Sequence, residues 1–285
     1  MYNRTDLALE KLKDATDAPR GITNKEVLYG DITVTHTVIE TEDGSSFLGK
    51  PIGDYITVTL PAPPQSSSHP EDNEKVVADE IRKLLPKKCE GILVLGLGNR
   101  DITPDALGPK TADSILATRH ISESLADEIG LSNLKSVAVI SPGVLGQTGI
   151  ETGEILAAVV NSISPSAVIV IDALAAKSIK RLGTTIQLSN TGISPGSGVG
   201  NARKEINSKT LGVPVISIGI PTVVEASTMI YDLTNTRYKD DTCGKMIVTP
   251  KEIDLIIEHS AKLLGFSINR ALQPEIDSEI LRLLV

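Results

Sequence analysis

Two aspartates are placed where an enzyme could use a pair of carboxyl groups. Asp105 opens a segment of helical character, with Thr103 as the expected cap and Pro104 in the first turn. Asp172 directly follows the apolar run 167–171, which has the character of a buried strand. Ionisation of both groups in a close pair of carboxyls is unfavourable because the two negative charges repel each other, so one keeps its proton while the other is a base. Such a pair, on either side of one water molecule, is sufficient to hydrolyse an amide.

The surroundings of the two acids favour opposite protonation states. The N-terminus of the expected helix 104–119 favours the charged form of Asp105, and the apolar strand end favours the protonated form of Asp172. The same positions also have an ordinary structural interpretation, because Asp is common in first helical turns and often binds loop amides after a strand. The residues alone therefore leave both a catalytic pair and a structural role open. If the two acids are coupled, their apparent pKa values belong to the pair and not to either residue.

A glycine-rich segment, 191–201, contains the pattern G-x-S-x-G at 192–196. In serine hydrolases the residue after the serine donates its backbone N–H to the oxyanion hole, but here that residue is Pro195, which has no N–H. The pattern therefore argues against a serine triad. The segment is either a long surface loop or a set of backbone N–H groups that bind a peptide. The second interpretation makes five residues candidates for substrate binding: Gly196, Ser197, Gly198, Gly200 and Asn201.

Neither a nucleotide site nor a metal site assembles from the motifs. The glycines at 96 and 98 begin a dinucleotide fingerprint, but its third glycine is replaced by Asp101, whose charge would repel a pyrophosphate. The next strand ends in Ser141 and Pro142 rather than in an acid that could bind a ribose. The four histidines lie in different segments without metal-ligand spacing. We expect no cofactor and no metal.

The composition limits the class of protein. The chain has 285 residues, a hydrophobic content of 40%, an aromatic content of 2% and a net charge of −8. Aliphatic residues without aromatics suit buried parallel strands covered by helices, and an acidic chain poor in aromatics is a poor match for nucleic acid. The two cysteines have no CxxC spacing, and neither an export signal nor a membrane span is recognisable. These features predict a cytoplasmic protein that binds neither nucleic acid directly nor a membrane.

The elements that must position the two acids alternate along the chain. Residues 1–20 are charged and irregular, which predicts a mobile or partly helical arm. A small antiparallel β part, about 26–60, has turn clusters at 42–44 and 49–51, and the proline-rich loop 61–68 follows it.

From 73 to 285, apolar strands alternate with helical patterns, and a capping box at 249–252 opens a helix that we expect to end at Gly265. This alternation predicts an α/β fold, with an open, doubly wound, mostly parallel sheet flanked by helices. We expect residues 21–285 to form a single domain. In open α/β sheets, sites form at the carboxyl ends of the strands, where both aspartates are expected.

Several blocks of the sequence resemble the spore germination endopeptidase family. They lie at 4–8 (RTDLA), 103–110 (TPDALGPK), 149–152 (GIET), 171–176 (IDALAA), 195–201 (PGSGVGN), 219–224 (GIPTVV) and 248–252 (VTPKE). The similarity covers nearly the whole chain, and several of the blocks are long and ungapped.

This resemblance implies an endopeptidase that degrades small acid-soluble, DNA-protecting spore proteins during germination, in the forespore and spore core. It also implies a homotetramer, made as a zymogen that removes a short N-terminal propeptide from itself near Arg4 and Thr5. The aspartates proposed as catalytic in the family fall on Asp105 and Asp172. The implied fold is similar to that of the hydrogenase-maturation peptidases, which use a metal. No histidine is found here at a matching strand end, which favours a metal-free aspartic mechanism.

Two alternative functions stay open from the sequence. A metallopeptidase of the hydrogenase-maturation type would be inactivated by chelators and restored by a divalent metal. A non-catalytic protein whose glycine-rich loops hold a peptide would bind it without turnover.

Overall fold

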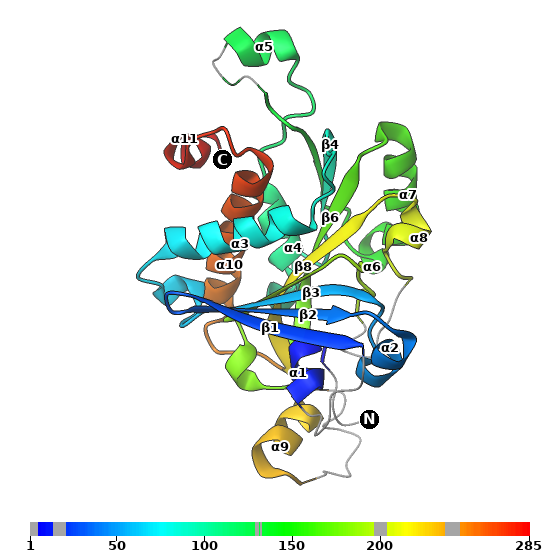
Figure 1. Cartoon of the computed structure of the whole chain (residues 1–285), viewed down its shortest axis with the longest axis vertical. Helices are drawn as coiled ribbons and strands as arrows, with labels where there is room; N and C mark the ends of the chain where they lie inside the picture. Colours follow the sequence, from blue (N-terminus) through cyan, green and yellow to red (C-terminus); the bar gives the residue numbers. More distant parts are fainter. Residues whose placement is uncertain (1–4, 14–20, 129–130, 132, 197–203, 237–245) are drawn as a thin grey trace.

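The computed structural model describes residues 5–13, 21–128, 131, 133–196, 204–236 and 246–285. In these residues, nine strands form one mixed sheet in the order β1-β2-β3-β7-β8-β6-β4-β5, with β9 paired to β8 (Figure 1). The strands are β1 (Ile22–Tyr29), β2 (Ile32–Ile39), β3 (Gly53–Thr59), β4 (Gly91–Gly96), β5 (Ser136–Ile140), β6 (Ala167–Ala176), β7 (Thr185–Ser189), β8 (Val215–Glu225) and β9 (Ile247–Val248). The α-helices are α1 (Ala8–Lys13), α2 (Glu42–Leu48), α3 (Pro70–Leu84), α4 (Leu107–Asp113), α5 (Glu123–Glu128), α6 (Leu145–Thr148), α7 (Thr152–Ile163), α8 (Ser208–Leu211), α9 (Ala226–Thr234), α10 (Ile253–Leu272) and α11 (Ser278–Leu284).

The sheet has a parallel core and an antiparallel side. Strands β5, β4, β6 and β8 are parallel to their neighbours in this group. Strands β1, β2 and β3 are antiparallel and continue the same sheet through β7. The predicted fold class is therefore confirmed: an open sheet with a parallel core, flanking helices and an antiparallel N-terminal part.

Helices cover both faces of the central strand β6. Ile169 and Ile171 belong to the core that β6 shares with α3 and α10, whereas Val168 and Val170 pack with side chains of α7. Figure 1 shows α3 and α10 on one side of the sheet and α7 and α8 on the other. Because successive side chains of a strand point to opposite faces, both sets must be apolar. This explains the uninterrupted apolar run that precedes Asp172.

Two helix boundaries differ from the predictions. The expected helix 104–119 is a single 3-10 turn, η2 (Thr103–Asp105), followed by the short α4. Helix α4 ends early because Asn269 of α10 binds the backbone after it, donating to the Ser114 carbonyl at 2.8 Å and accepting from the Leu116 N–H at 2.9 Å. Helix α10 does not end at Gly265. A Cβ atom on Gly265 would lie 2.5 Å from the Cβ atom of Ser114, so this glycine allows α10 to pack closely.

Two predicted turn and cap motifs have other roles. The cluster at 42–44 is the start of α2, because the Thr41 side chain accepts the Gly44 N–H at 3.2 Å. Gly49, with φ of 57°, ends this helix. The expected capping box before α10 does not form: no side chain caps the helix, and the Thr249 hydroxyl instead donates to the Thr222 carbonyl at 2.9 Å.

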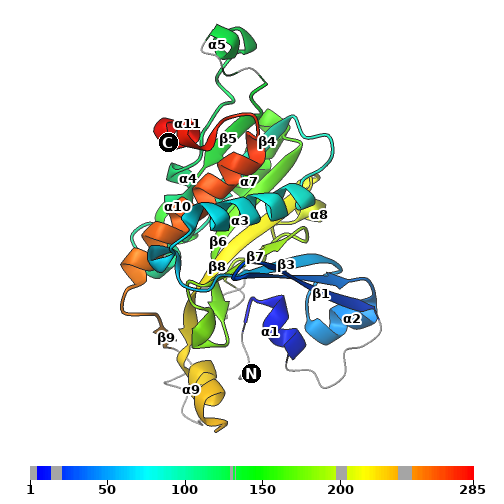
Figure 2. The same ribbon diagram turned by 60° about the vertical axis from the view of Figure 1, so that its left-hand side comes forward.

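The described part of the N-terminal arm is packed onto the sheet. Helix α1 confirms the partly helical expectation, but residues 5–10 are largely buried rather than mobile. Figure 2 shows α1 and α2 on the side of β1, β2 and β3 opposite to α3. Residues 1–4 and 14–20 lie outside the described residues.

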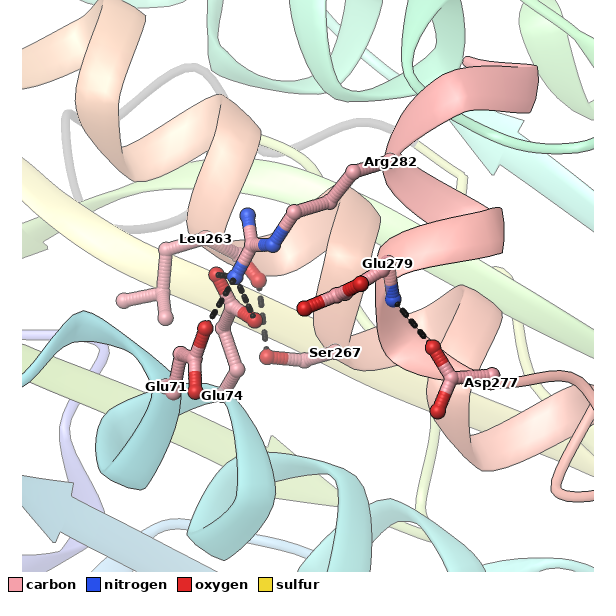
Figure 3. A network of polar contacts seen from close by, with 7 residues as sticks. All are labelled: Glu71, Glu74, Leu263, Ser267, Asp277, Glu279 and Arg282. Atoms are coloured by element: carbon pink, nitrogen blue, oxygen red, sulfur yellow. Dashed lines mark hydrogen bonds and ion pairs between the residues drawn. The ribbon is translucent and has the colours of Figure 1, made fainter.

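The last helix, α11, is tied to α3 by Arg282. One nitrogen of its guanidinium lies 2.7 and 2.8 Å from the two carboxylate oxygens of Glu74, and its central carbon lies 4.6 Å from the centre of the Phe266 ring (Figure 3 shows the Glu74 contact). Burial raises the pKa of Glu74, and Arg282 opposes that increase. The C-terminus is thereby bound to the helical layer that covers the main core.

Candidate active site

Asp172 lies within β6 rather than at its end. The strand continues to Ala176 because β8 still pairs with it there, and Asp172 itself is opposite Gly219. The two-residue period places Asp172 on the same face as Val170 and Leu174. Its side chain is 7% exposed, and one carboxyl oxygen accepts the Ala173 N–H at 2.9 Å.

Asp105 is the last residue of the 3-10 turn that follows β4. One of its carboxyl oxygens accepts the Asn99 N–H at 2.7 Å, which fixes the side chain against the loop 97–101. That loop requires glycine at 98, where φ is 116° and a Cβ atom would lie 1.9 Å from the Asp105 carbonyl oxygen. The predicted cap is wrong, because Thr103 is inside the turn and makes no capping hydrogen bond.

Close backbone packing brings this turn against β6. The Leu97 N–H donates to the Ile171 carbonyl at 2.8 Å, so the chain after β4 is held beside the residue that precedes Asp172. A Cβ atom on Gly108 would lie 2.2 Å from the Leu97 oxygen and 2.6 Å from the Ile171 oxygen, and only glycine allows this approach. On the other side, the buried Thr222 hydroxyl of β8 donates to the Pro104 carbonyl at 2.8 Å.

The two predicted acids are electrostatically coupled. The pKa of Asp172 is raised well above its usual range, first by burial and then by the negative charges of Asp105 and Asp6. The Ala173 hydrogen bond opposes this shift. The direction agrees with the prediction that Asp172 is the protonated member of the pair.

A cavity of about 320 Å³ opens beside Asp172. Its wall includes Asp6, Lys50, Gln187 and Gly196. Gly196 is the one candidate of the glycine-rich segment within the described residues. Ser197, Gly198, Gly200 and Asn201 lie outside them, and their expected role stays a prediction.

The N-terminal segment binds the end of β6 beside this cavity. Asp6 donates its N–H to the Ala175 carbonyl and accepts the Ala175 N–H with its carboxylate, both at 2.9 Å. Glu10 accepts the N–H groups of Lys177 and Ser178 at 2.8 and 3.0 Å. Of the predicted processing residues, Arg4 lies outside the described part, and Thr5 is buried with its hydroxyl bonded to Glu10.

Sequence reasoning missed three residues of the site: Asp6, Lys50 and Gln187. Each reaches the cavity from a different part of the chain, and no local periodicity or spacing links them to Asp172. A signal was available only for Asp6, which lies in the block 4–8. Within the described residues, no group of three His, Cys, Asp or Glu side chains is arranged to hold a metal ion.

Comparison with known proteins identifies the family. A family profile described as "Germination protease" matches residues 3–239. The chain belongs to this family. A germination protease of Caldanaerobacter subterraneus subsp. tengcongensis is 44% identical over 95% of this chain and 94% of its own length. One of Clostridium tetani is 41% identical over 98% of both chains. The chain is accordingly a spore germination protease, and the predicted family resemblance is confirmed.

Among solved structures, a NiFe hydrogenase maturation protease from Thermococcus kodakarensis is similar with a TM-score of 0.38 and 15% identity. The similarity covers 66% of this chain and 98% of that one. In the part of the chain that the structure describes, no helix is long and apolar enough to cross a membrane.

Proposed function

We propose that this germination protease is a self-processing endopeptidase that hydrolyses peptide bonds with an aspartate pair, Asp105 and Asp172. Its substrates are the small acid-soluble, DNA-protecting spore proteins, whose degradation it begins during germination. The observation that carries this proposal is the electrostatic coupling of a buried Asp172 to Asp105, beside a cavity that borders a bound segment of chain.

The two acids can divide the proton transfers of amide hydrolysis. Asp105 is half-buried at the end of η2, and in its ionised form it takes a proton from a water molecule. Asp172, whose raised pKa favours the protonated form, donates its proton to the leaving amine. The attacking oxygen bonds to the carbonyl carbon, the C–N bond breaks, and the products are a carboxylic acid and an amine.

The bound N-terminal segment supports self-processing. Residues 5–8 lie along the end of the strand that carries Asp172, and Asp6 lines the same cavity as Asp172. We place the processing near Arg4 and Thr5, which removes a short propeptide. The protease is proposed to act as a homotetramer in the cytoplasm of the forespore and in the spore core.

Incubation with a purified small acid-soluble spore protein tests this function. Asp105→Asn and Asp172→Asn should each lower the cleavage rate at least about 100-fold, since general acid–base groups contribute about 10²–10⁴. Asp113→Asn, which changes an exposed carboxylate paired with Arg100, is the matched control and should cleave at the wild-type rate. Mass spectrometry of the same samples reports loss of the chain's own N-terminal residues.

Three results would contradict the proposal. Full activity in either Asn variant excludes the aspartate pair. Loss of activity with chelators, restored by a divalent metal, indicates a metallopeptidase. Binding of the spore protein without cleavage indicates a non-catalytic protein.

A further inference from the structure

The carbonyl oxygen of Asp6 receives two side-chain hydrogen bonds. The Lys50 ammonium donates to it at 2.8 Å, and the Gln187 side-chain amide donates to it at 3.0 Å. Lys50 follows α2, Gln187 belongs to β7, and both line the cavity that contains Asp172. Two donors that converge on one carbonyl oxygen form the arrangement that stabilises an oxyanion in acyl transfer.

Residues 5–8 are held as a peptide substrate would be. Strand β4 ends at Gly96, opposite Ile171, and four residues further along β6 Asp6 binds Ala175 through its backbone N–H and its carboxylate. The Leu7 side chain is fully buried in an apolar pocket that includes Leu174. A peptide that adds to a sheet edge and inserts an alternate side chain is a general mode of peptide recognition.

The bound segment itself orients the Gln187 donor. The Gln187 side chain is 8% exposed, and its amide oxygen accepts the Ala8 N–H at 2.7 Å, so its nitrogen is directed at the Asp6 carbonyl. Lys50 directly follows the left-handed Gly49 that ends α2, and its ammonium donates to the same carbonyl. Donors that already point at the carbonyl oxygen cost little reorganisation when charge develops on it.

We propose that Lys50 and Gln187 are catalytic residues that stabilise the oxyanion of the peptide bond cleaved in this site, which in the bound segment is the bond between Asp6 and Leu7, the residues that follow Arg4 and Thr5. The proposal rests on the proposed peptidase function. When water attacks the carbonyl carbon, the electron pair of the C=O bond moves to the oxygen, and the ammonium and amide N–H groups stabilise that negative charge. Collapse of the intermediate restores the C=O bond and expels the amine, which takes a proton from the acid of the aspartate pair.

The test uses the full chain and a quenched fluorescent peptide with the sequence of residues 1–12. Lys50→Met should lower kcat about 100-fold or more with KM nearly unchanged, since removal of one oxyanion donor costs about 10²–10³ in kcat. Gln187→Leu should lower kcat by a similar factor. It should also raise KM, because the variant loses the hydrogen bond that Gln187 accepts from the peptide N–H two residues after the reacting carbonyl, the position of Ala8 in the bound segment. Lys50→Arg should recover kcat to within about 10-fold of wild type. Lys262→Met, at an exposed pair with Glu258, controls for the loss of a charge.

The outcomes separate this inference from the proposed function. If Lys50 and Gln187 only fasten the N-terminal segment, Lys50→Met frees the site and its kcat equals or exceeds that of wild type. That result, with Asp105→Asn inactive, overturns the inference and leaves the peptidase function intact. A wild-type chain that does not cleave the peptide, or an Asp105→Asn variant that cleaves normally, overturns both.

Discussion

Replacing Asp172 by Asn should stabilise the folded chain at neutral pH while it abolishes cleavage. The Asp172 carboxyl is buried and faces the charges of Asp105 and Asp6, so the folded state raises its pKa. An amide has the same shape, can still accept the Ala173 N–H, and has no charge to desolvate. The variant therefore removes the unfavourable burial of a charge that the wild-type chain carries at this position.

The sign of the pH dependence follows from proton binding. Below pH about 3.9 the carboxyl is protonated in both the unfolded and the folded chain, and its pKa shift has no effect on stability. As pH rises, the unfolded chain releases the proton that the folded chain keeps, so the free energy of unfolding of wild type falls until pH exceeds the folded pKa of Asp172. The loss is about 1.4 kcal/mol for each unit by which the pKa is raised. For a chain of this length, that is a fall in Tm of about 2–3 °C per unit.

Urea unfolding at a series of pH values between 4 and 8 measures this effect. The difference in unfolding free energy between Asp172→Asn and wild type should increase with pH, and it should increase less in an Asp105→Asn background, where one cause of the shift is absent. Asp113→Asn is a control in which the change in stability should have the opposite sign. Arg100 lowers the pKa of the exposed Asp113, so this variant should lose a little stability at pH values above the pKa of Asp113 in the unfolded chain. A difference between Asp172→Asn and wild type that is constant from pH 4 to 8 would refute the argument from a buried, coupled carboxyl.

Two further predictions concern packing. Gly108→Ala should lower the free energy of unfolding by about 1–3 kcal/mol and slow cleavage, because its Cβ atom would lie 2.2 Å from the backbone oxygen of Leu97. Thermal unfolding measures the loss of stability. Gly146→Ala is the control: a Cβ atom there would meet open space, so this variant should be neutral or stabilising in the same assay. Arg282→Met should lower the free energy of unfolding, measured in urea, by about 1–3 kcal/mol. The loss should be larger at pH 8 than at pH 4, because without the guanidinium nothing from Arg282 opposes the increase that burial causes in the pKa of Glu74, and a charged Glu74 then destabilises the folded chain. Lys262→Met, which breaks the exposed ion pair with Glu258, should change the free energy of unfolding by less than about 0.5 kcal/mol. If Arg282→Met and Lys262→Met lost the same stability, Arg282 would not bind α11 to α3 more strongly than a surface pair does.

The parallel core was predictable because its signals are local. Short apolar runs separated by helical patterns predicted β4, β5, β6 and β8, and the structure makes β4 and β6 direct neighbours. That adjacency is what brings Asp105 near Asp172. The lengths of the helices around the site were not predictable in the same way. The end of α4 is set by Asn269, a residue more than 150 positions away, whose side chain binds the backbone after Ser114.

The N-terminal segment could not be placed from the sequence, for a related physical reason. Its charged and irregular sequence predicted a mobile or partly helical arm, whereas in the structure Asp6 and Glu10 accept backbone N–H groups at the end of β6. Carboxylates that satisfy buried amides leave no periodic pattern. The position of Asp172 inside β6 was hidden similarly, because only the continued pairing with β8 shows that the strand passes through it.

The end of β4 explains why the N-terminal segment and Asp105 both lie near Asp172. Because β4 leaves the sheet after Gly96, the edge of β6 beyond Ile171 is open to another chain, and Asp172 is the first residue of that open stretch. Beyond Gly96 the chain also enters the turn that contains Asp105, so the end of β4 determines both the proposed peptide-binding edge and the position of the second carboxyl group. If a substrate strand binds this edge as proposed, it competes with residues 5–8 for the N–H and C=O groups of Ala175. The proposed function therefore predicts that the N-terminal segment leaves this edge before another protein is cleaved.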